Sequence, residues 1–160
     1  MKIGIGCDHA GFEIKEIVKE HLSRTYSILD FGTNSIDSVD YPEYGHKVGN
    51  AILTSTVDSG IIICGSGIGI SIAANKIKNV RAALCTSVEH AIMSRKHNDA
   101  NILALGARMT ETSIILKIIY AWINTDFEGG RHQNRIDKIE IKWKSIVLTL
   151  RLVKQFVESF

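Results

Sequence analysis

Apolar and polar positions alternate along this chain in two ways that follow one another repeatedly. Short runs rich in β-branched residues are each followed by a segment whose apolar residues recur three or four positions apart, the period of a helix. Strands are therefore expected at residues 2–6, 26–31, 59–64, 81–85 and 101–105, and helices at residues 12–23, 42–53, 68–76, 87–96 and 110–123. This alternation predicts an α/β fold, a three-layer sandwich with helices on both faces of a five-stranded parallel sheet.

The C-terminal part of the chain contains two expected helices and an apolar, basic end. Thr110 is the expected N-cap of the helix that ends near residue 123. A further helix is expected over residues 132–143. The apolar and basic stretch after it, residues 144–160, is compatible with a docking helix, a partner surface or a poorly ordered end.

Composition narrows the class of protein. The chain has 160 residues, of which 45% are hydrophobic and 22% charged, as in an ordinary soluble globular domain. A net charge of +2 with few, scattered aromatic residues does not suggest a nucleic-acid partner. The N-terminus does not resemble a signal peptide, and no run approaches the roughly 20 apolar residues of a membrane span. We therefore expect a cytoplasmic protein without a membrane partner.

The three cysteines are Cys7, Cys64 and Cys85. Because none forms a CxxC pair, neither a disulfide framework nor a metal site is indicated. Cys7 and Cys85 are expected to be packing residues.

Polar side chains follow three of the expected strands at their carboxyl ends. Asp8 and His9 follow the first strand, Cys64 ends the third, and Arg108 follows the fifth. Because the carboxyl ends of parallel strands share one edge of a sheet, these residues are expected to lie on one rim, where ligands bind in such folds.

A glycine-rich turn, Gly65 to Gly69, follows Cys64. It departs from the dinucleotide-binding motif GxGxxG because its third glycine comes one residue early. In addition, no acidic residue lies at a strand end about 20 positions later, where such proteins bind the ribose of the dinucleotide. The turn could still direct several backbone N–H groups at an anion, or it could be a tight turn without a ligand. Cys64 beside it could be a buried packing residue or, next to a helix N-terminus, a reactive thiolate.

Two further groups of polar residues also have both a structural and a functional interpretation. His97 could cap the end of its helix, or it could transfer protons, with Asn98 beside it binding a sugar hydroxyl. Arg131 and Arg135 stand four residues apart, so on a helix they would share one face. They could form a fork for a phosphate or a solvated basic surface, and they could reach the rim from a neighbouring subunit.

Six stretches of the sequence together resemble type B ribose-5-phosphate isomerase, a family that includes the bacterial galactose-6-phosphate isomerase subunits. They are GCDHAGF, DYPEY, ICGSGIGISIAANK, RAALC, SRKHNDANILALGAR and EGGRHQNR, in family order. The resemblance covers roughly residues 1–141. It implies an isomerase domain at residues 1–142 and leaves residues 143–160 as a tail of unknown role.

The resemblance implies a flavodoxin-like or Rossmann-like sandwich that works as a homodimer or tetramer. It implies that ribose 5-phosphate and ribulose 5-phosphate are interconverted through an enediolate without metal or coenzyme. It further implies that each active site is shared, with the His97 and Arg131 regions of one subunit meeting the Cys64 loop of the other.

The resemblance also assigns roles to individual residues. Cys64 corresponds to the base that moves a proton between C1 and C2, and the N–H groups of Gly65, Gly67 and Gly69 belong to the enediolate cradle. The remaining matches concern sugar binding and ring opening (Asp8, Ser66 and His97), a hydroxyl contact (Asn98), the phosphate site (His9, Arg108, Arg131 and Arg135) and the surroundings of the sugar (Tyr41).

The chain departs from the family in two ways: Ser66 stands where family members often have threonine, and the family pattern tends to end near Lys142. Some members use a glutamate base in the helix after the loop; this chain has Asn75 in that region and Cys64 in place, which favours the cysteine type. Three alternatives remain at this point: an isomerase of allose 6-phosphate or galactose 6-phosphate, a sugar-phosphate sensor without turnover, and a non-catalytic nucleotide-binding module.

Overall fold

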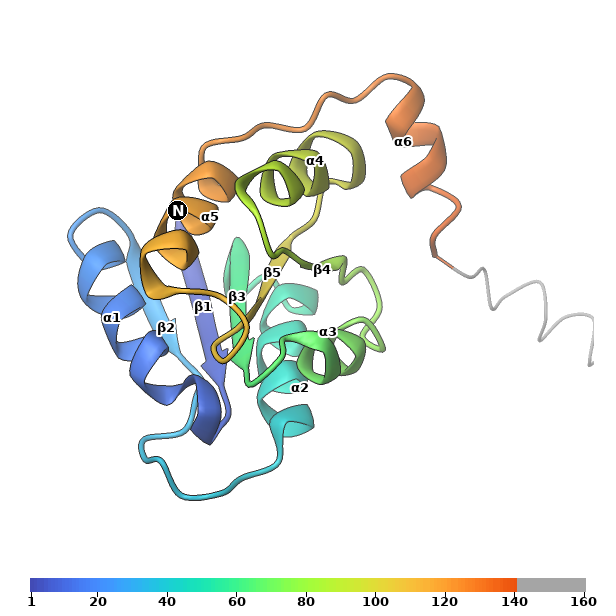
Figure 1. The fold of residues 1–160 in the computed structure, drawn as a ribbon. Coiled ribbons are helices and arrows are strands. Elements are labelled where there is room, and N and C mark those ends of the chain that lie inside the picture. Colours follow the sequence, from blue (N-terminus) through green and yellow to red (C-terminus); the bar gives the residue numbers. More distant parts are fainter. Residues whose placement is uncertain (141–160) are drawn as a thin grey trace, which may run out of the picture.

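The computed structural model describes residues 1–140. In this part of the chain, five strands form one parallel sheet in the order β2-β1-β3-β5-β4 (Figure 1). The strands are β1 (Lys2–Cys7), β2 (Ser27–Asp30), β3 (Ser59–Cys64), β4 (Ala82–Leu84) and β5 (Ile102–Gly106). The predicted five-stranded parallel sheet is confirmed.

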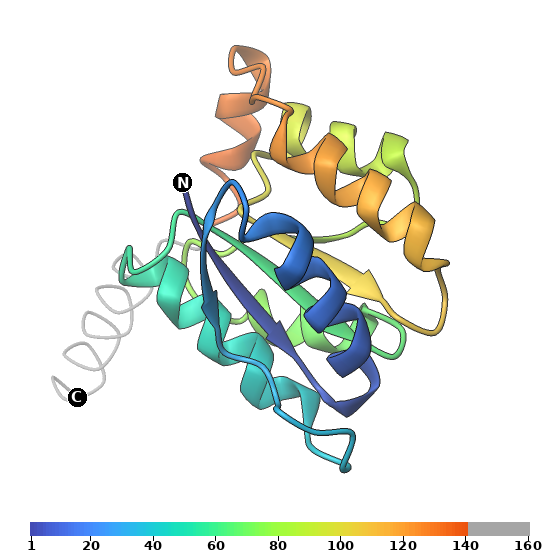
Figure 2. The same cartoon turned by 90° about the vertical axis from the view of Figure 1, so that its left-hand side faces the viewer.

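The helices of residues 1–140 connect these strands and cover both faces of the sheet (Figures 1 and 2). They are η1 (His9–Gly11, a 3-10 turn), α1 (Phe12–Leu22), α2 (Tyr41–Leu53), α3 (Ile68–Ala74), α4 (Val88–Asn98), α5 (Thr112–Ile123) and α6 (Arg131–Ile136). Helices α1, α4 and α5 contribute to one hydrophobic core, and α2 and α3 to the other. The predicted three-layer α/β sandwich is therefore confirmed.

Strand β3 lies at the centre of the sheet and contributes to both cores. Ile61 and Ile63 belong to the core under α1, α4 and α5, whereas Ile62 and Cys64 belong to the core under α2 and α3. Because successive side chains of a strand point to opposite faces, a continuously apolar strand can fill both layers.

Glycine at position 6 allows α2 to pack against the backbone of β1. A Cβ atom at Gly6 would lie 2.7 Å from Val48 Cγ2 and 3.0 Å from the carbonyl oxygen of Tyr44. Ile3, Ile5 and Cys7 alternate with Gly4 and Gly6, so β1 presents side chains to one core and bare backbone to α2.

Several predicted helix boundaries are wrong: α3 ends two residues before residue 76, and α4 ends two residues after residue 96. Helix α5 starts after Glu111 rather than Thr110, because the carbonyl of Glu111 accepts the N–H groups of both Ile114 and Ile115. Helix α6 ends at Ile136, where three-residue turns replace helical bonding, so residues 137–140 are not helical as predicted. The predicted tail and the domain boundary at residues 142/143 lie outside the described residues.

Candidate active site

The first cluster of polar residues lies at the carboxyl edge of the sheet. Asp8 follows β1, Cys64 ends β3, and Arg108 follows β5 by two residues. Cys7 pairs with Ile63 and Cys64 pairs with Gly106 across the sheet, so the three strands end at the same level. The predicted common rim for these three positions is confirmed.

The connections of the sheet change direction at this edge. From β1 the chain passes through α1 to β2 on one side, and from β2 it returns through α2 to β3 on the other side of β1. Since α1 follows β1 on one face and α3 follows β3 on the other, the connections that leave these two neighbouring strands diverge at their carboxyl ends. Ligands of open α/β sheets bind at such a switch point, and here it is flanked by Asp8 and Cys64.

The glycine loop after Cys64 turns its backbone toward the thiol. Gly67 has φ +76° and caps α3, and its N–H donates to Cys64 Sγ over 3.1 Å. The N–H of Ile68 donates to Ser66 Oγ over 3.3 Å. Cys64 is buried, with 4% of its surface exposed. The loop therefore brings amide donors, a hydroxyl and a thiol together within one turn.

Asp8 and His9 form the next part of this rim. Asp8 is buried, and its Oδ1 accepts the N–H groups of Ala10 and Gly11, which caps the short turn η1. The N–H of Val39 donates to His9 Nδ1 over 3.2 Å. The loop before α2 thus fixes the imidazole orientation of His9.

Arg108 and Tyr41 border the glycine loop from two other elements. The Arg108 N–H donates to the Gly65 carbonyl over 2.9 Å, and a Cβ at Gly65 would lie 3.5 Å from Arg108 Cδ. The Tyr41 ring lies so close to Gly69 that a Cβ there would be 2.6 Å from ring carbons. The structure therefore places both predicted substrate-binding side chains against the loop.

The other two cysteines and Asn75 have structural positions. Cys7 and Cys85 are buried, and burial raises the pKa of Cys7 to about 12 and the pKa of Cys85 to about 11, so both stay protonated near neutral pH. Their predicted packing role is confirmed. The Asn75 amide pairs with the edge strand β4, since its Nδ2–H donates to the carbonyl of Ala82 and its Oδ1 accepts the N–H of the same residue, both over 2.8 Å.

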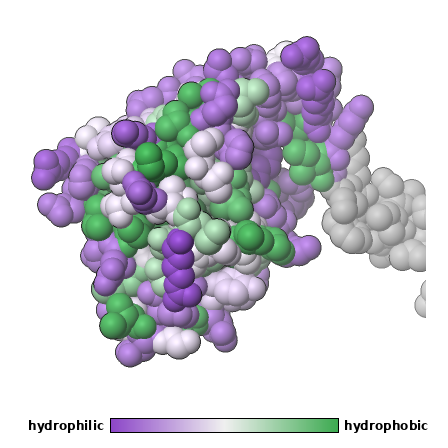
Figure 3. Space-filling view, viewed as in Figure 1, coloured by the Kyte–Doolittle hydropathy of each residue, from purple (hydrophilic) through white to green (hydrophobic). Residues whose placement is uncertain are grey.

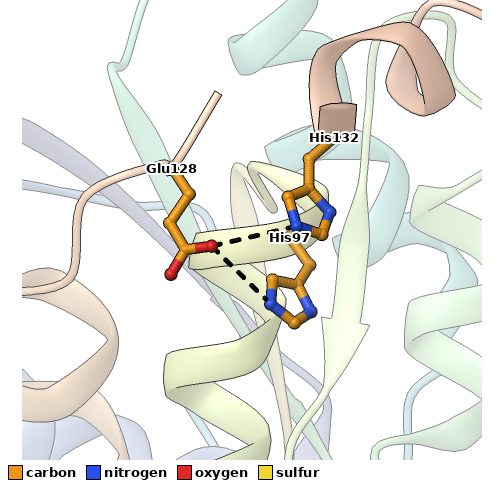
Figure 4. Close-up of side chains that lie close together, drawn as sticks. All are labelled: His97, Glu128 and His132. Atoms are coloured by element: carbon orange, nitrogen blue, oxygen red, sulfur yellow. Dashed lines mark ion pairs between the residues drawn. The ribbon is translucent and has the colours of Figure 1, made fainter. Parts of the chain in front are cut away.

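The second cluster joins the end of α4 to the start of α6. The imidazoles of His97 and His132 stack with ring centroids 4.2 Å apart and an angle of 6° between their planes (Figure 4). Glu128 Oε2 lies 3.9 Å from His97 Nε2 and 3.8 Å from His132 Nε2. Arg131 and Arg135 are exposed on α6, and Asn98 is exposed at the end of α4. The expected shared helix for the two arginines is confirmed.

Sequence reasoning missed Glu128 and His132, although both lie in the stretch EGGRHQNR. His132 is 4% exposed, and its Nε2 atom is buried without a hydrogen-bond partner. Burial and the nearby His97, Arg131 and Arg135 lower the pKa of His132, so this ring is neutral at neutral pH. The sequence pattern around the two glycines of this stretch does not indicate that either residue contacts His97.

A metal ion is the obvious alternative occupant of this cluster, because one ligand atom from each of His97, Glu128 and His132 lies within 4.8 Å of the others. A ligating imidazole directs its nitrogen lone pair at the ion within the ring plane. The lone pairs of two stacked rings lie in separate, nearly parallel planes, so they do not meet at one ion. Binding a metal here would require one imidazole to rotate, which disfavours this occupant.

The two clusters lie near opposite ends of the strands: one at the carboxyl end and the other at the amino end. Helix α4 ends at Asn98, shortly before Ile102 opens β5, whereas Cys64 pairs with Gly106 at the end of β5. The five residues of β5 span about 13 Å at about 3.3 Å per residue. Figures 1 and 2 both show α6 on the far side of the molecule from the carboxyl ends of β1 and β3. One chain therefore does not bring His97 or Arg131 to Cys64.

The fold and the rim together define a doubly wound α/β protein with a buried thiol and a glycine loop at its topological switch point. Comparison with known proteins gives the family. The model of the ribose/galactose isomerase family matches residues 3–139. The chain belongs to this family.

Individual relatives and solved structures agree with this assignment. The chain is 46% identical over 139 residues to ribose-5-phosphate isomerase B of Escherichia coli, which covers 86% of this chain and 93% of that protein. It superposes on the Clostridium thermocellum ribose-5-phosphate isomerase B with a TM-score of 0.86 and 51% identity, over 87% and 95% of the two chains. A Mycoplasma genitalium ribose-5-phosphate isomerase B structure with bound ribulose 5-phosphate matches with a TM-score of 0.84 and 41% identity, over 90% and 96% of the two chains.

Proposed function

We propose that this chain is an aldose–ketose isomerase that interconverts D-ribose 5-phosphate and D-ribulose 5-phosphate. The observation that carries the proposal is the Cys64 thiol, which accepts the Gly67 N–H at the switch-point end of β3. The family membership and the named activity of its close relatives support the same reaction.

The thiol and the glycine loop supply the two requirements of proton transfer at carbon. Cys64, as the thiolate, removes the proton from one carbon and returns it to the next. The enediolate that forms between these steps is stabilised by N–H groups from Gly65 to Gly69, because preorganised donors favour an oxyanion more than the neutral sugar. No step of this mechanism requires a metal ion or a coenzyme.

Other residues of the two clusters bind and open the sugar. The phosphate dianion would be held by guanidinium and imidazole groups, and its binding orients the reacting end. We assign the phosphate to His9, Arg108, Arg131 and Arg135, ring opening and sugar binding to Asp8, Ser66 and His97, a hydroxyl contact to Asn98, and the border of the sugar site to Tyr41.

These roles require a second copy of the chain, because the two clusters lie at opposite edges of one sheet. We propose a homodimer, or a tetramer built from such dimers, in which His97 and Arg131 of one copy face Cys64 of another. Exposed apolar side chains beside the glycine loop are suited to burial in such an interface: Ile68 (54% exposed), Ile72 (55%) and Met109 (70%). Hydrophobic surface is visible as separate green patches between hydrophilic residues in Figure 3.

The cellular location and the extent of the catalytic domain are part of the same proposal. Among the described residues, none of the helices has the length and apolar character to cross a membrane. We propose a cytoplasmic enzyme whose isomerase domain comprises residues 1–142.

The direct test measures ribulose 5-phosphate formation from ribose 5-phosphate by the purified protein in the presence of EDTA, beside the Cys64→Ala variant. We expect turnover by the wild type only, with ribose 5-phosphate still bound by the variant. General-base groups typically contribute about 10² to 10⁴-fold to a rate, so unchanged turnover in Cys64→Ala would remove the thiol from this role.

A six-carbon substrate is a second candidate, because the matching family model covers galactose as well as ribose isomerases. Allose 6-phosphate and galactose 6-phosphate should be assayed beside ribose 5-phosphate. Higher kcat/KM for a six-carbon sugar would reassign the substrate. Binding of sugar phosphates without turnover would indicate a sensor, and nucleotide binding alone would indicate a non-catalytic nucleotide-binding module.

A further inference from the structure

Glu128 lies where the loop before α6 meets the end of α4. Its backbone N–H donates to the carbonyl of Lys96 over 3.1 Å, and its Oε1 atom lies 3.3 Å from Lys96 Nζ. Both the backbone and the side chain of Glu128 are therefore tied to the residue that precedes His97. This double attachment fixes the carboxylate relative to the helix end that carries the imidazole.

The second carboxylate oxygen faces the two stacked imidazoles. Glu128 Oε2 lies 3.9 Å from His97 Nε2, and His132 covers one face of the His97 ring (Figure 4). The side chain of His97 is 32% exposed, whereas that of His132 is 5% exposed. The His97 ring is thus held along one edge and one face and remains open to a ligand elsewhere.

The contacts of His132 leave His97 as the accessible imidazole of the cluster. Arg135 Nη1 lies 3.5 Å from His132 Nδ1, and because a guanidinium only donates, this nitrogen accepts. Neutral His132 then carries its hydrogen on Nε2, which lies 3.8 Å from Glu128 Oε2, and adds no positive charge next to His97. Lys96 contacts Glu128, Arg131 and Arg135 lie near His132, and Glu128 supplies the carboxylate that faces the imidazole of His97.

We propose that Glu128 is a positioning residue, which holds and electrostatically supports His97 as the acid–base group that opens the furanose ring of ribose 5-phosphate. The inference rests on the proposed function and adds to it a residue that does not touch the substrate. In this step the C1–O4 bond breaks, the ring oxygen gains a proton and the anomeric hydroxyl loses one. The products are the C1 aldehyde and the free 4-hydroxyl, so no oxidant or reductant is needed.

Ring opening can be separated from isomerisation by the choice of substrate. Ribulose 5-phosphate has its C5 oxygen esterified, so its C2 ketone cannot close a five-membered ring, and it enters the site in open form. Proton removal at its C1 carbon requires Cys64 and the glycine loop but no ring opening. Deuterium uptake at C1 of ribulose 5-phosphate in D₂O therefore reports isomerisation chemistry alone.

The experiment compares the wild type with Glu128→Gln and with Glu89→Gln, an equivalent change at an exposed carboxylate in the first turn of α4. For Glu128→Gln we expect kcat for ribose 5-phosphate to fall by about ten-fold or more. We expect its deuterium uptake into ribulose 5-phosphate to stay within about two-fold of the wild type. Glu89→Gln should match the wild type in both assays.

The outcomes separate this inference from the function on which it rests. Wild-type protein without activity in either assay would overturn the proposed isomerase and, with it, the role of Glu128. An active wild type with Glu128→Gln equally active on ribose 5-phosphate would overturn the positioning role alone. Equal losses in both assays would also overturn it, since a general structural defect lowers both rates.

Discussion

Lys15 shows how one residue can depart from the pattern of its helix. It lies on α1 with a fully buried side chain, beside the apolar residues Val18 and Leu22. Its ammonium contacts Asp30 Oδ2 and the Thr33 carbonyl, each over 2.8 Å, and Glu16 Oε1 over 2.9 Å. Burial alone would lower the pKa of Lys15, but the hydrogen bonds to Asp30 and Glu16 outweigh it and raise the pKa. The charge is therefore retained inside the fold.

Replacement of Lys15 should destabilise the protein. We expect Lys15→Met to lower the free energy of unfolding by about 3 kcal/mol, the low end of the range for a broken buried ion pair, because Lys19 still contacts Asp30. Urea unfolding at neutral pH measures the change. Lys117→Met, on an exposed position of α5, is the control and should change stability by less than about 0.5 kcal/mol.

The same network predicts a pH dependence. Burial would raise the pKa of Asp30, but the hydrogen bonds from Lys15 and Lys19 outweigh it and lower the pKa. The stability that Asp30 contributes is present above its unfolded pKa of about 4 and is lost as the pH falls below it. Unfolding followed between neutral and acidic pH should show a smaller acid loss in Lys15→Met than in the wild type. Equal losses would contradict the coupling.

Thiol chemistry offers a further test at single residues. Burial raises the pKa of Cys7 to about 12 and of Cys85 to about 11, so neither forms appreciable thiolate at about pH 8. We expect iodoacetamide to modify the folded protein at Cys64 only, and ribose 5-phosphate to slow that reaction. Peptide mass spectrometry locates the label. Labelling of Cys7 or Cys85 before unfolding would contradict the prediction.

At the scale of elements, the start of α3 links the fold to the chemistry. Gly67 has φ +76°, and a Cβ atom there would lie 2.5 Å from Leu84 Cδ1 and 2.8 Å from the carbonyl carbon of Leu105. Only glycine accommodates this conformation and this close approach together. The strand, the loop and the first turn of α3 thus place the Gly67 N–H at Cys64 Sγ.

The paired variants Gly67→Ala and Gly129→Ala separate backbone strain from steric overlap. Gly129 also has positive φ, at +66°, but a Cβ there would meet nothing within 4 Å. We expect Gly129→Ala to cost about 1–2 kcal/mol of stability from strain alone, and Gly67→Ala to cost clearly more and to lose isomerase activity. Thermal unfolding and turnover provide the comparison. Equal destabilisation of the two variants would show that the close packing around Gly67 is unimportant.

At the scale of the whole molecule, the sheet separates the two polar clusters. The thiol loop lies at its carboxyl edge, and the cluster of His97, Glu128 and His132 lies near its amino edge. A site that uses both clusters has to be assembled between copies of the chain. Symmetric association of two copies would then create two equivalent sites.

Complementation between inactive variants tests this shared site. Cys64→Ala and His97→Ala chains are each expected to be inactive on ribose 5-phosphate alone. In a mixed dimer, one site carries both substitutions and the other carries neither. Co-expression should therefore restore about a quarter of the wild-type activity when chains pair at random, since half of the dimers are mixed and each has one intact site. No restoration would contradict the shared site.

The elements and the rim could be predicted from local features of the sequence. Alternating strand and helix periods correctly indicate all five strands. Residues within two positions of a strand's end, such as Asp8 and Arg108, lie on the carboxyl edge of the parallel sheet. The limits of α5 and α6 were missed because helix ends depend on which carbonyl accepts which N–H, as at Glu111, and residue spacing does not specify this.

By itself, the sequence determined the α/β class, the order of elements along the chain and the position of Cys64 beside a glycine turn. These features depend on near neighbours, whose spacing sets the local period and the turn. Only the tertiary structure decided that Lys15 is buried with its charge, that β5 lies between β3 and β4, and that His132 stacks on His97 against Glu128. These contacts join segments far apart in the chain, and their partners are set by how helices and strands pack, which no local pattern contains.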